Sequence, residues 1–192
     1  MCLLQDPPPI GNSSELDFAP AGITDVPPFT VRSATAKDAD DIDALIAESY
    51  GALLTPVYHN DVLSRALPRL LRTPPSLLAG GSYFVADAGG LLLGAGGWSQ
   101  ATPFGGVGPA CNGHMRRVAV RPDFIRSGIG ALIVDHTLDH AREQGVKNMH
   151  CLSTLAAEDF YAAQGFKATG EVELTLEPGL YLPAIQMGRA LH

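Results

Sequence analysis

The sequence contains no long hydrophobic run and no recognisable leader segment. Because a run of about 18 apolar residues is needed to span a bilayer, we expect no transmembrane helix and no membrane partner. The first ten residues, MCLLQDPPPI, lack the basic start, apolar centre and small-residue cleavage site of a secretory signal, which favours the cytoplasm. With 192 residues and 46% hydrophobic content, the chain is expected to be globular, soluble and able to bury one sizeable core.

Cysteines are also scarce. Cys2, Cys111 and Cys151 are too few and too scattered for a disulfide framework or a cysteine-rich zinc site. Cys151 lies in an apolar segment, where we expect it to pack as a small hydrophobic side chain. His136 and His140 have the spacing of a zinc pair, but they lack the glutamate of His-Glu-x-x-His and have no evident third ligand. We therefore expect no metal.

Basic residues are in deficit, with 13 Lys and Arg against 20 Asp and Glu and a formal net charge of −7. Proteins that bind nucleic acids in general need a basic surface to neutralise phosphates, so this balance argues against a nucleic-acid partner. It leaves room for a local basic pocket, and it mildly favours a cationic acceptor.

The order of the expected elements indicates a mixed α/β (α+β) sheet with helices on its faces. Residues 1–27 are rich in proline and small polar residues without periodicity, and we predict a flexible tail there. The folded domain is expected over residues 28–192. Strands are predicted at 29–33, 83–87, 91–98, 114–120, 148–153, 171–176 and 184–190, and helices at 35–50, 61–71, 127–144 and 156–164.

One short stretch carries a chemical signal: RPDFIRSGIGA, residues 121–131, places a Gly-x-Gly step between the apolar strand VAV and a long helical pattern. The N–H groups of a first helical turn have no intrahelical partner, and the helix dipole is positive there. Glycines at positions 128 and 130 would let a phosphate approach those N–H groups, and Arg126 adds a positive charge. By itself, the step is also compatible with a tight strand-to-helix turn.

Two segments together resemble the GCN5-related N-acetyltransferase (GNAT) superfamily. RRVAVRPDFIRSGIGALIV is similar to its strand and acyl-CoA loop, and STLAAEDFYAAQGF is similar to its late helix ending in Tyr-x-x-x-Gly-Phe. The resemblance extends from about Phe29 to the end of the chain. Two positions depart from the usual pattern: Ile125 stands where Gln or Arg is common, and Thr154 stands where Asn is common.

The resemblance implies a mostly antiparallel central sheet of about seven strands, flanked by about four helices, with a splay between two central parallel strands. It implies acetyl-CoA as co-substrate, with its pyrophosphate on the loop, where Arg126 and the backbone amides make up for Ile125. The pantetheine arm would pair with the preceding strand as an added strand does. The residues implied in cofactor binding are Val118, Ala119, Val120, Arg126, Ser127, Gly128, Ile129, Gly130, Ala131, Thr154 and Ala157.

The implied reaction is direct attack of a neutral primary amine, on a small molecule or peptide, on the thioester of acetyl-CoA. A backbone N–H near Val120 is the implied oxyanion donor. Tyr161 matches the tyrosine that often protonates the departing sulfur, although it could instead only pack against the cofactor or the core. His114 falls where several members carry a glutamate that activates the amine, and an imidazole with a pKa of about 6.5 suits that role.

Other interpretations stay open at the sequence level. A non-catalytic acyl-CoA-binding module, or a transferase using another acyl-CoA, would carry the same motifs, and a generic nucleotide-binding protein would not need the pantetheine arm. No motif identifies the acceptor. Tyr50, Tyr58, His59 and Trp98 lie where the superfamily builds or borders its acceptor site, but ordinary packing is the favoured interpretation of each. The resemblance also allows a homodimer, because dimers are common in the superfamily.

Overall fold

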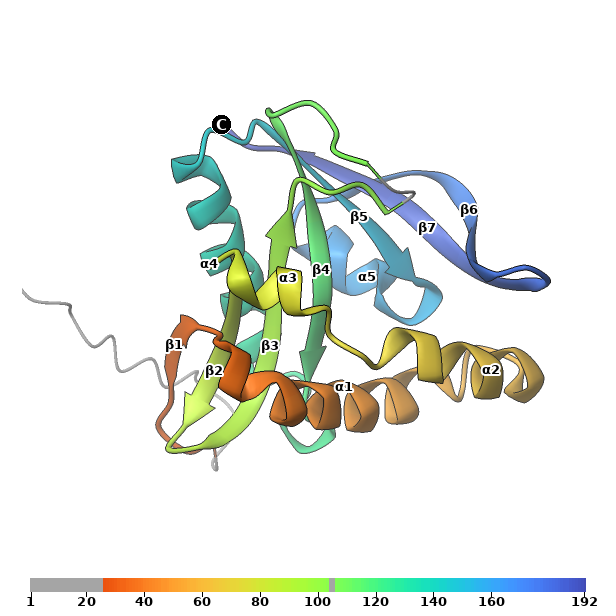
Figure 1. Cartoon of the computed structure of the whole chain (residues 1–192), viewed down its shortest axis with the longest axis horizontal. Coiled ribbons are helices and arrows are strands. Elements are labelled where there is room, and N and C mark those ends of the chain that lie inside the picture. The colour runs from red at the N-terminus through yellow and green to blue at the C-terminus, as the bar shows by residue number, and fades with distance from the viewer. Residues whose placement is uncertain (1–25, 104–105) are drawn as a thin grey trace, which may run out of the picture.

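The computed structural model of the chain, shown in Figure 1, describes residues 26–103 and 106–192. The tail expected over residues 1–27 therefore lies outside the described residues, except for its last two. None of the described helices is long and apolar enough to cross a membrane. The helices and strands are β1 (Thr30–Ser33), α1 (Ala39–Leu54), α2 (Asn60–Leu70), α3 (Pro75–Ala79), β2 (Tyr83–Ala88), β3 (Leu91–Ser99), β4 (Asn112–Val120), α4 (Ile129–Glu143), β5 (Asn148–Thr154), α5 (Glu158–Ala163), β6 (Lys167–Glu177) and β7 (Leu180–Ala190).

The strands form one seven-stranded sheet in the order β1-β2-β3-β4-β5-β7-β6. Among the described strands only β4 and β5 pair in parallel, and they do so over three residue pairs, from Asn112↔Asn148 to His114↔His150. Beyond that point the two strands separate toward their C-terminal ends, as Figure 1 shows. The expected mostly antiparallel sheet with a splay between its central parallel strands is confirmed.

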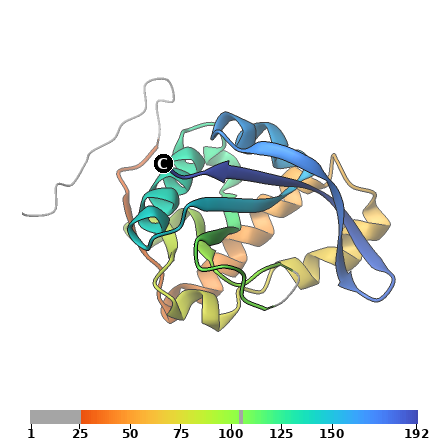
Figure 2. The same cartoon turned by 90° about the horizontal axis from the view of Figure 1, so that it is seen from above.

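Helices cover both faces of this sheet (Figures 1 and 2). On one face, α4 and α5 pack against a core that includes Val134, Leu138 and Met149. On the other face, α1 and α3 pack against a second core, in which Ile42 and Leu45 meet residues of β2 and β3. These helical stripes were predicted from the 3.6-residue period of apolar side chains. We call the side of the sheet covered by α4 and α5 the α4/α5 face, and the opposite side the α1/α2 face.

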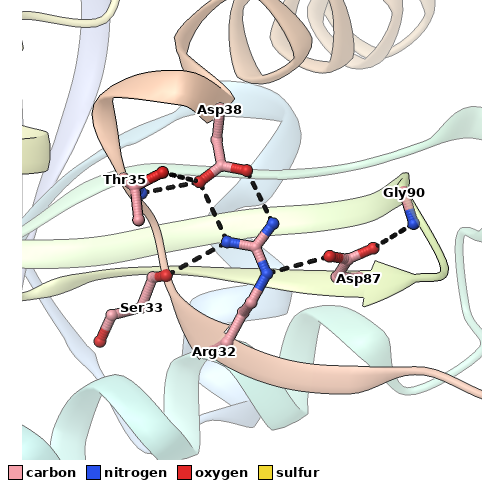
Figure 3. A network of polar contacts seen from close by, with 6 residues as sticks. All are labelled: Arg32, Ser33, Thr35, Asp38, Asp87 and Gly90. Atoms are coloured by element: carbon pink, nitrogen blue, oxygen red, sulfur yellow. Dashed lines mark hydrogen bonds and ion pairs between the residues drawn. The ribbon is translucent and has the colours of Figure 1, made fainter.

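The start of the first helix is fixed by a polar network, drawn in Figure 3. The N–H of Thr35 and its hydroxyl both donate to Asp38 Oδ2, at 2.7 and 2.9 Å. Arg32 donates to Asp38 Oδ1 at 2.7 Å and to Asp87 Oδ2 at 2.9 Å, and this guanidinium holds the pKa of Asp38 well below its ordinary value. Asp87 also accepts the N–H of Gly90. The network joins β1 to the turn before α1 and to the β2–β3 hairpin.

The sequence-based prediction contained four helices, and the described residues contain five α-helices. The additional helix, α3, begins at Pro75, where no element was predicted. Proline is favoured at the first position of a helix because its missing N–H has no intrahelical partner there. Pro75 therefore starts α3, after α2 has already ended at Leu70.

The glycines of GAGG in β3 allow α4 to lie close to the sheet. A Cβ on Gly94 would stand 2.7 Å from Ile133 Cδ1, and a Cβ on Gly96 would stand 2.9 Å from Ile133 Cγ2. Both distances are too short for a side chain, so these glycines set the distance between β3 and α4. This packing positions the N-terminus of α4 beside the end of β4.

Candidate active site

The first turn of α4 presents free backbone amides. Gly128 has φ +88°, in the left-handed region that favours glycine, and stands immediately before the helix. The first backbone bond of the turn runs from the N–H of Leu132 to Gly128 O at 3.0 Å. Within the described residues, the amides of Gly128, Gly130 and Ala131 donate to no backbone carbonyl. This is the arrangement that binds anions at helix N-termini.

The side chains of the same loop divide between solvent and interior. Arg126 is exposed, has φ +65° and forms no ion pair within the part of the chain that the structure describes. Ser127 is buried, and both its hydroxyl and its N–H donate to Phe124 O, at 2.6 and 3.3 Å. Ile129 is also buried. The loop therefore offers a positive side chain at Arg126 and backbone groups elsewhere.

Gly130 brings this loop close to α5 and to the end of β4. A Cβ on Gly130 would stand 3.2 Å from Phe160 Cε2 and 3.3 Å from Val120 Cγ2. These contacts leave little room for a side chain, so the glycine fits a tight junction. The predicted phosphate loop and the predicted late helix, which are 30 residues apart in the sequence, are thereby neighbours.

A cavity of about 100 Å³ lies where β4 and β5 separate. Four of the predicted site residues line it: Val118 from β4, Thr154 at the end of β5, and Ala157 and Tyr161 from the turn and helix that follow. The other lining residues are Tyr50, Leu53, Leu54, Met115, Arg117, Cys151, Leu152 and Ala156. Within residues 26–103 and 106–192, β4 has no strand partner on this side beyond His114, so alternate backbone groups of its second half are open to an added strand.

The two remaining cofactor-binding residues predicted on this strand are Ala119 and Val120, which lie on the same open stretch of β4. The side chain of Ala119 is buried in the α1 core, so this residue can offer a ligand only its backbone. The side chain of Val120 packs with the core beneath α4, beside Gly130.

Strand β4 contains a bulge at Arg117. Its register with β3 runs from Ala119↔Ala95 to Arg116↔Gly97, so β4 has one residue more than β3 over this step. Arg117 has φ +44°, its carbonyl accepts a hydrogen bond from Tyr83 Oη at 2.9 Å, and its guanidinium donates to the carbonyl of Leu70 at the end of α2. The bulge therefore directs the Arg117 side chain to the α1/α2 face.

A second cavity, of about 280 Å³, lies over the paired end of β4 and β5. It contains the predicted base His114, and its other lining residues are Thr102, Pro103, Gly108, Pro109, Asn112, His150, Cys151, Leu152 and Gln186. Met149 and Cys151 are buried in the α4/α5 core, so strand alternation places His150 and Leu152 on the α1/α2 face. Cys151 and Leu152 line both cavities.

The electrostatic setting of His114 favours the neutral imidazole. Burial lowers its pKa, and the nearby Arg116 and His150 lower it further because each repels a second positive charge. The rings of His114 and His150 lie 5.5 Å apart between centroids. A histidine with a pKa below its ordinary value of about 6.5 is largely unprotonated at pH 7 and can accept a proton.

Tyr161 has the opposite character. Burial raises its pKa well above the ordinary value, with a smaller contribution from Cys151, so the phenol stays protonated. Its ring makes edge contacts with Phe160 and Phe166, at centroid distances of 5.2 and 5.4 Å. Among the hydrogen bonds of residues 26–103 and 106–192, none involves its hydroxyl. A proton donor is thus held in the cavity by packing alone.

The other aromatic candidates have different surroundings. Tyr50 lines the first cavity. Tyr58 joins three segments, because its hydroxyl donates to Pro183 O at 2.8 Å and accepts the N–H of Leu155 at 2.9 Å. Trp98 is buried in the α4/α5 core and donates to His140 Nδ1 at 3.0 Å, so packing describes it. His59 is exposed immediately before α2.

Sequence reasoning did not single out Arg117, His150 or Gln186. Arg117 owes its position to a bulge, and bulges depend on how neighbouring strands pair. His150 and Gln186 belong to strands that were predicted, but their place beside His114 follows from the strand order. Only the alternation within NMHCLST indicated that His150 points to the face opposite Cys151.

Comparisons with known proteins agree with this geometry. Residues 79–168 match the model of the acetyltransferase (GNAT) domain family. A GCN5-related N-acetyltransferase from Rhodopseudomonas palustris has 17% identity and a TM-score of 0.65, over 88% of this chain and 100% of that one. The PaiA N-acetyltransferase of Thermoplasma acidophilum, solved with coenzyme A, has 14% identity and a TM-score of 0.64, over 84% and 98%. A search of curated proteins gave no match.

A further solved structure, yncA from Salmonella typhimurium with its cofactor acetyl-CoA, has 19% identity and a TM-score of 0.61, over 85% of this chain and 94% of that one. At these identities the likeness concerns the fold. The match over residues 79–168 and the splayed sheet make the chain similar to GNAT acetyltransferases in that segment of the sequence and in fold.

Proposed function

We propose that this protein transfers the acetyl group of acetyl-CoA directly to a primary amine of a small molecule or peptide. The observation that carries the proposal is a pair of cavities that share Cys151 and Leu152 as lining residues. A proton donor, Tyr161, lines the cavity in the splay, and a proton acceptor, His114, lines the cavity on the α1/α2 face. The proposal needs the donor and the acceptor on either side of the thioester.

The proposed cofactor site extends along the α4/α5 face. The pyrophosphate of acetyl-CoA lies at the amides of residues 128–131, with Arg126 as its cationic partner. The pantetheine arm follows the open stretch of β4 from Met115 to Val120, with Thr154 and Ala157 on the opposite wall. This places the thioester at the junction of the two cavities.

The proposed reaction needs two proton movements and one transient charge. The amine nitrogen attacks the thioester carbon while His114 takes the proton of the amine, and an open backbone N–H of β4 beside the thioester stabilises the oxyanion. The carbon–sulfur bond then breaks, and the Tyr161 hydroxyl gives its proton to the sulfur. The products are the N-acetylated amine and coenzyme A with a free thiol.

Direct transfer is preferred over a covalent acetyl-enzyme because of Cys151. This thiol lines both cavities, but burial raises its pKa to about 12, and the thiolate is the nucleophilic form. The same apolar surroundings affect the proton transfer from Tyr161 to the released sulfur. A coenzyme A thiolate released beside Cys151 is also poorly solvated, so its proton affinity rises toward that of the phenol and the final transfer becomes easier.

Free thiol release tests the proposal. The purified full chain is incubated with acetyl-CoA and a panel of primary amines, and coenzyme A thiol is measured together with the mass of the acetylated product. Release that depends on an amine, with stoichiometric product, is expected. Binding of acetyl-CoA by calorimetry without release for any amine would indicate a binding module, and release only with a longer acyl-CoA would indicate a different donor.

Gly128→Ala is expected to weaken acetyl-CoA binding by about tenfold, because a Cβ strains a backbone with φ +88° and crowds the anion site. The strain also lowers the free energy of unfolding by about 1 kcal/mol. Gly145→Ala is the matched control: Gly145 has φ +81° at the other end of α4, and nothing lies within 4 Å of its Cβ position. Calorimetry should show lost affinity for Gly128→Ala alone, while both variants lose similar stability. Equal affinities of the wild type and Gly128→Ala for acetyl-CoA would contradict the proposed phosphate site on the backbone amides.

Arg126→Ala is expected to raise the dissociation constant of acetyl-CoA about five- to tenfold, since one charge-assisted contact to phosphate is lost. Arg126→Lys should recover part of the affinity. Arg126→Gly also removes the charge but suits the backbone φ of +65°, so it separates loss of charge from strain. If affinity for acetyl-CoA is unchanged in all three variants, Arg126 plays no part in binding and the backbone amides hold the anion alone.

A further inference from the structure

Among the described residues that line the two cavities, Arg117 is the single charged one, and it forms no ion pair with a described residue. In the described part of the chain, ion pairs occupy the arginines at positions 32, 65, 69, 121 and 142. Arg117 has no such pair, and its recorded side-chain hydrogen bond goes to the carbonyl of Leu70. Most of the five N–H donors of this guanidinium therefore stay available in the cavity.

The surroundings add positive charge and donors, with no acid to offset them. Among the described residues, no Asp or Glu lines either cavity, although the whole chain carries a net charge of −7. Burial lowers the pKa of Arg116, and repulsion by Arg117 lowers it further, so the two guanidiniums lie close enough to interact. Arg116 is itself held by Ser99 and Ala101 in the loop. A positive potential is thus concentrated at this site.

The position of Arg117 separates it from the proposed phosphate site. Its side chain reaches Leu70 of α2 on the α1/α2 face, whereas the loop at residues 126–131 leads into α4 on the opposite face. The backbone at Arg117 is also held at φ +44°, a conformation that a non-glycine residue adopts rarely and at a cost, and that is concentrated at functional sites. The Tyr83 hydroxyl bound to its carbonyl fixes this conformation.

We infer that Arg117 binds an anionic group, a carboxylate or a phosphate, carried by the acceptor amine. The inference rests on the proposed function and narrows the acceptor to amines that bear a negative charge, such as amino acids, peptides with a nearby carboxylate, or amino phosphates. The planar guanidinium suits the two oxygens of either group. The cavity beside His114 holds the rest of the molecule, so the anion orients the amine toward the thioester.

Matched acceptors test the inference with the full-length wild-type chain. The pairs are an L-amino acid and its amide, and phosphoethanolamine and ethanolamine, with kcat/KM corrected for the neutral fraction of each amine. The anionic member of at least one pair is expected to be favoured by about tenfold or more. The pair that shows the preference identifies carboxylate or phosphate. Equal use of charged and neutral members in both pairs overturns the inference.

Variants then assign the preference to Arg117. Arg117→Gln should reduce the preference to about twofold or less, and Arg117→Lys should keep part of it. Arg72→Gln is the control, because Arg72 is an exposed arginine just after α2 that lines neither cavity. Equal loss of preference in Arg72→Gln would mean that the net charge of the protein causes the preference, and it would overturn the assignment. An Arg117-dependent preference for succinyl-CoA over acetyl-CoA would also overturn it, because Arg117 would then bind the acyl donor.

A binding measurement distinguishes failure of the proposed function from failure of the inferred anion site. If no amine gives thiol release, calorimetry in the presence of coenzyme A compares an N-acetyl amino acid with its amide, and N-acetyl phosphoethanolamine with N-acetyl ethanolamine. Tighter binding of a charged member by wild type supports the anion site without catalysis. Binding of neither charged compound overturns the inference independently. The wild-type comparison also holds if Arg117→Gln fails to fold.

Discussion

Replacing Tyr161 with phenylalanine is expected to lower kcat by about 100-fold, while the dissociation constant of acetyl-CoA changes by less than about threefold. The substitution removes only the hydroxyl. The ring contacts with Phe160 and Phe166 remain, and no hydrogen bond between described residues is broken. A large loss of rate without a loss of binding or folding would therefore isolate the proton transfer.

Tyr50→Phe provides the matched control for this substitution. Tyr50 lines the same cavity, and burial raises its pKa in the same direction as that of Tyr161. It comes from α1, however, away from the predicted late helix. Steady-state kinetics should show kcat for Tyr50→Phe within about threefold of wild type. A loss of kcat confined to Tyr50→Phe would mean that Tyr50, and not Tyr161, is the acid. Full activity of Tyr161→Phe would mean that Tyr161 only packs.

The elements of the fold could largely be predicted from local patterns. The alternation in TVRS and in the hairpin strands and the helical spacing of Ile42, Leu45 and Ile46 all correspond to elements of the structure. The separation of β4 from β5 could not be read from any of these patterns, because it is a relation between strands far apart in the sequence. It was expected only through the resemblance to the superfamily.

The phosphate loop shows where local reasoning succeeds and where it ends. Glycine at position 128 was predicted to let a phosphate approach the helix N-terminus, and the structure gives it φ +88°, a conformation that glycine adopts easily. The same stretch gave no sign that Ser127 turns inward to Phe124. That contact depends on the 3-10 turn at Pro122–Phe124, which folds the loop back toward the core.

Arg117 was missed because its position depends on a strand bulge. In a regular strand, Arg116 and Arg117 would point to opposite faces. The bulge puts both on the α1/α2 face, and only the register between β3 and β4 reveals it. A net charge of −7 likewise gave no indication of a basic cavity, because composition averages over the whole surface. Local chemistry of this kind depends on tertiary contacts.

Replacing His114 with alanine is expected to lower kcat by about 100-fold at saturating acetyl-CoA, with cofactor binding retained. The pH dependence gives the sharper readout. The pKa of His114 is lowered below about 6.5, so the base is neutral at pH 7 and wild-type activity, corrected for the neutral fraction of the amine, should fall only as the pH drops below that range. The variant should lack this acidic limb, because the group that must be deprotonated is gone.

His150→Ala is the control, and the sign of its effect can be worked out. The positive form of His150 lowers the pKa of His114, and the two rings are 5.5 Å apart. Removing it relieves that repulsion, so the pKa of His114 rises and the acidic limb of kcat/KM moves to higher pH while the maximal rate stays within about threefold. The same acidic limb in wild type and in His114→Ala, with or without His150, would exclude His114 as the base and assign proton removal to another group or to solvent.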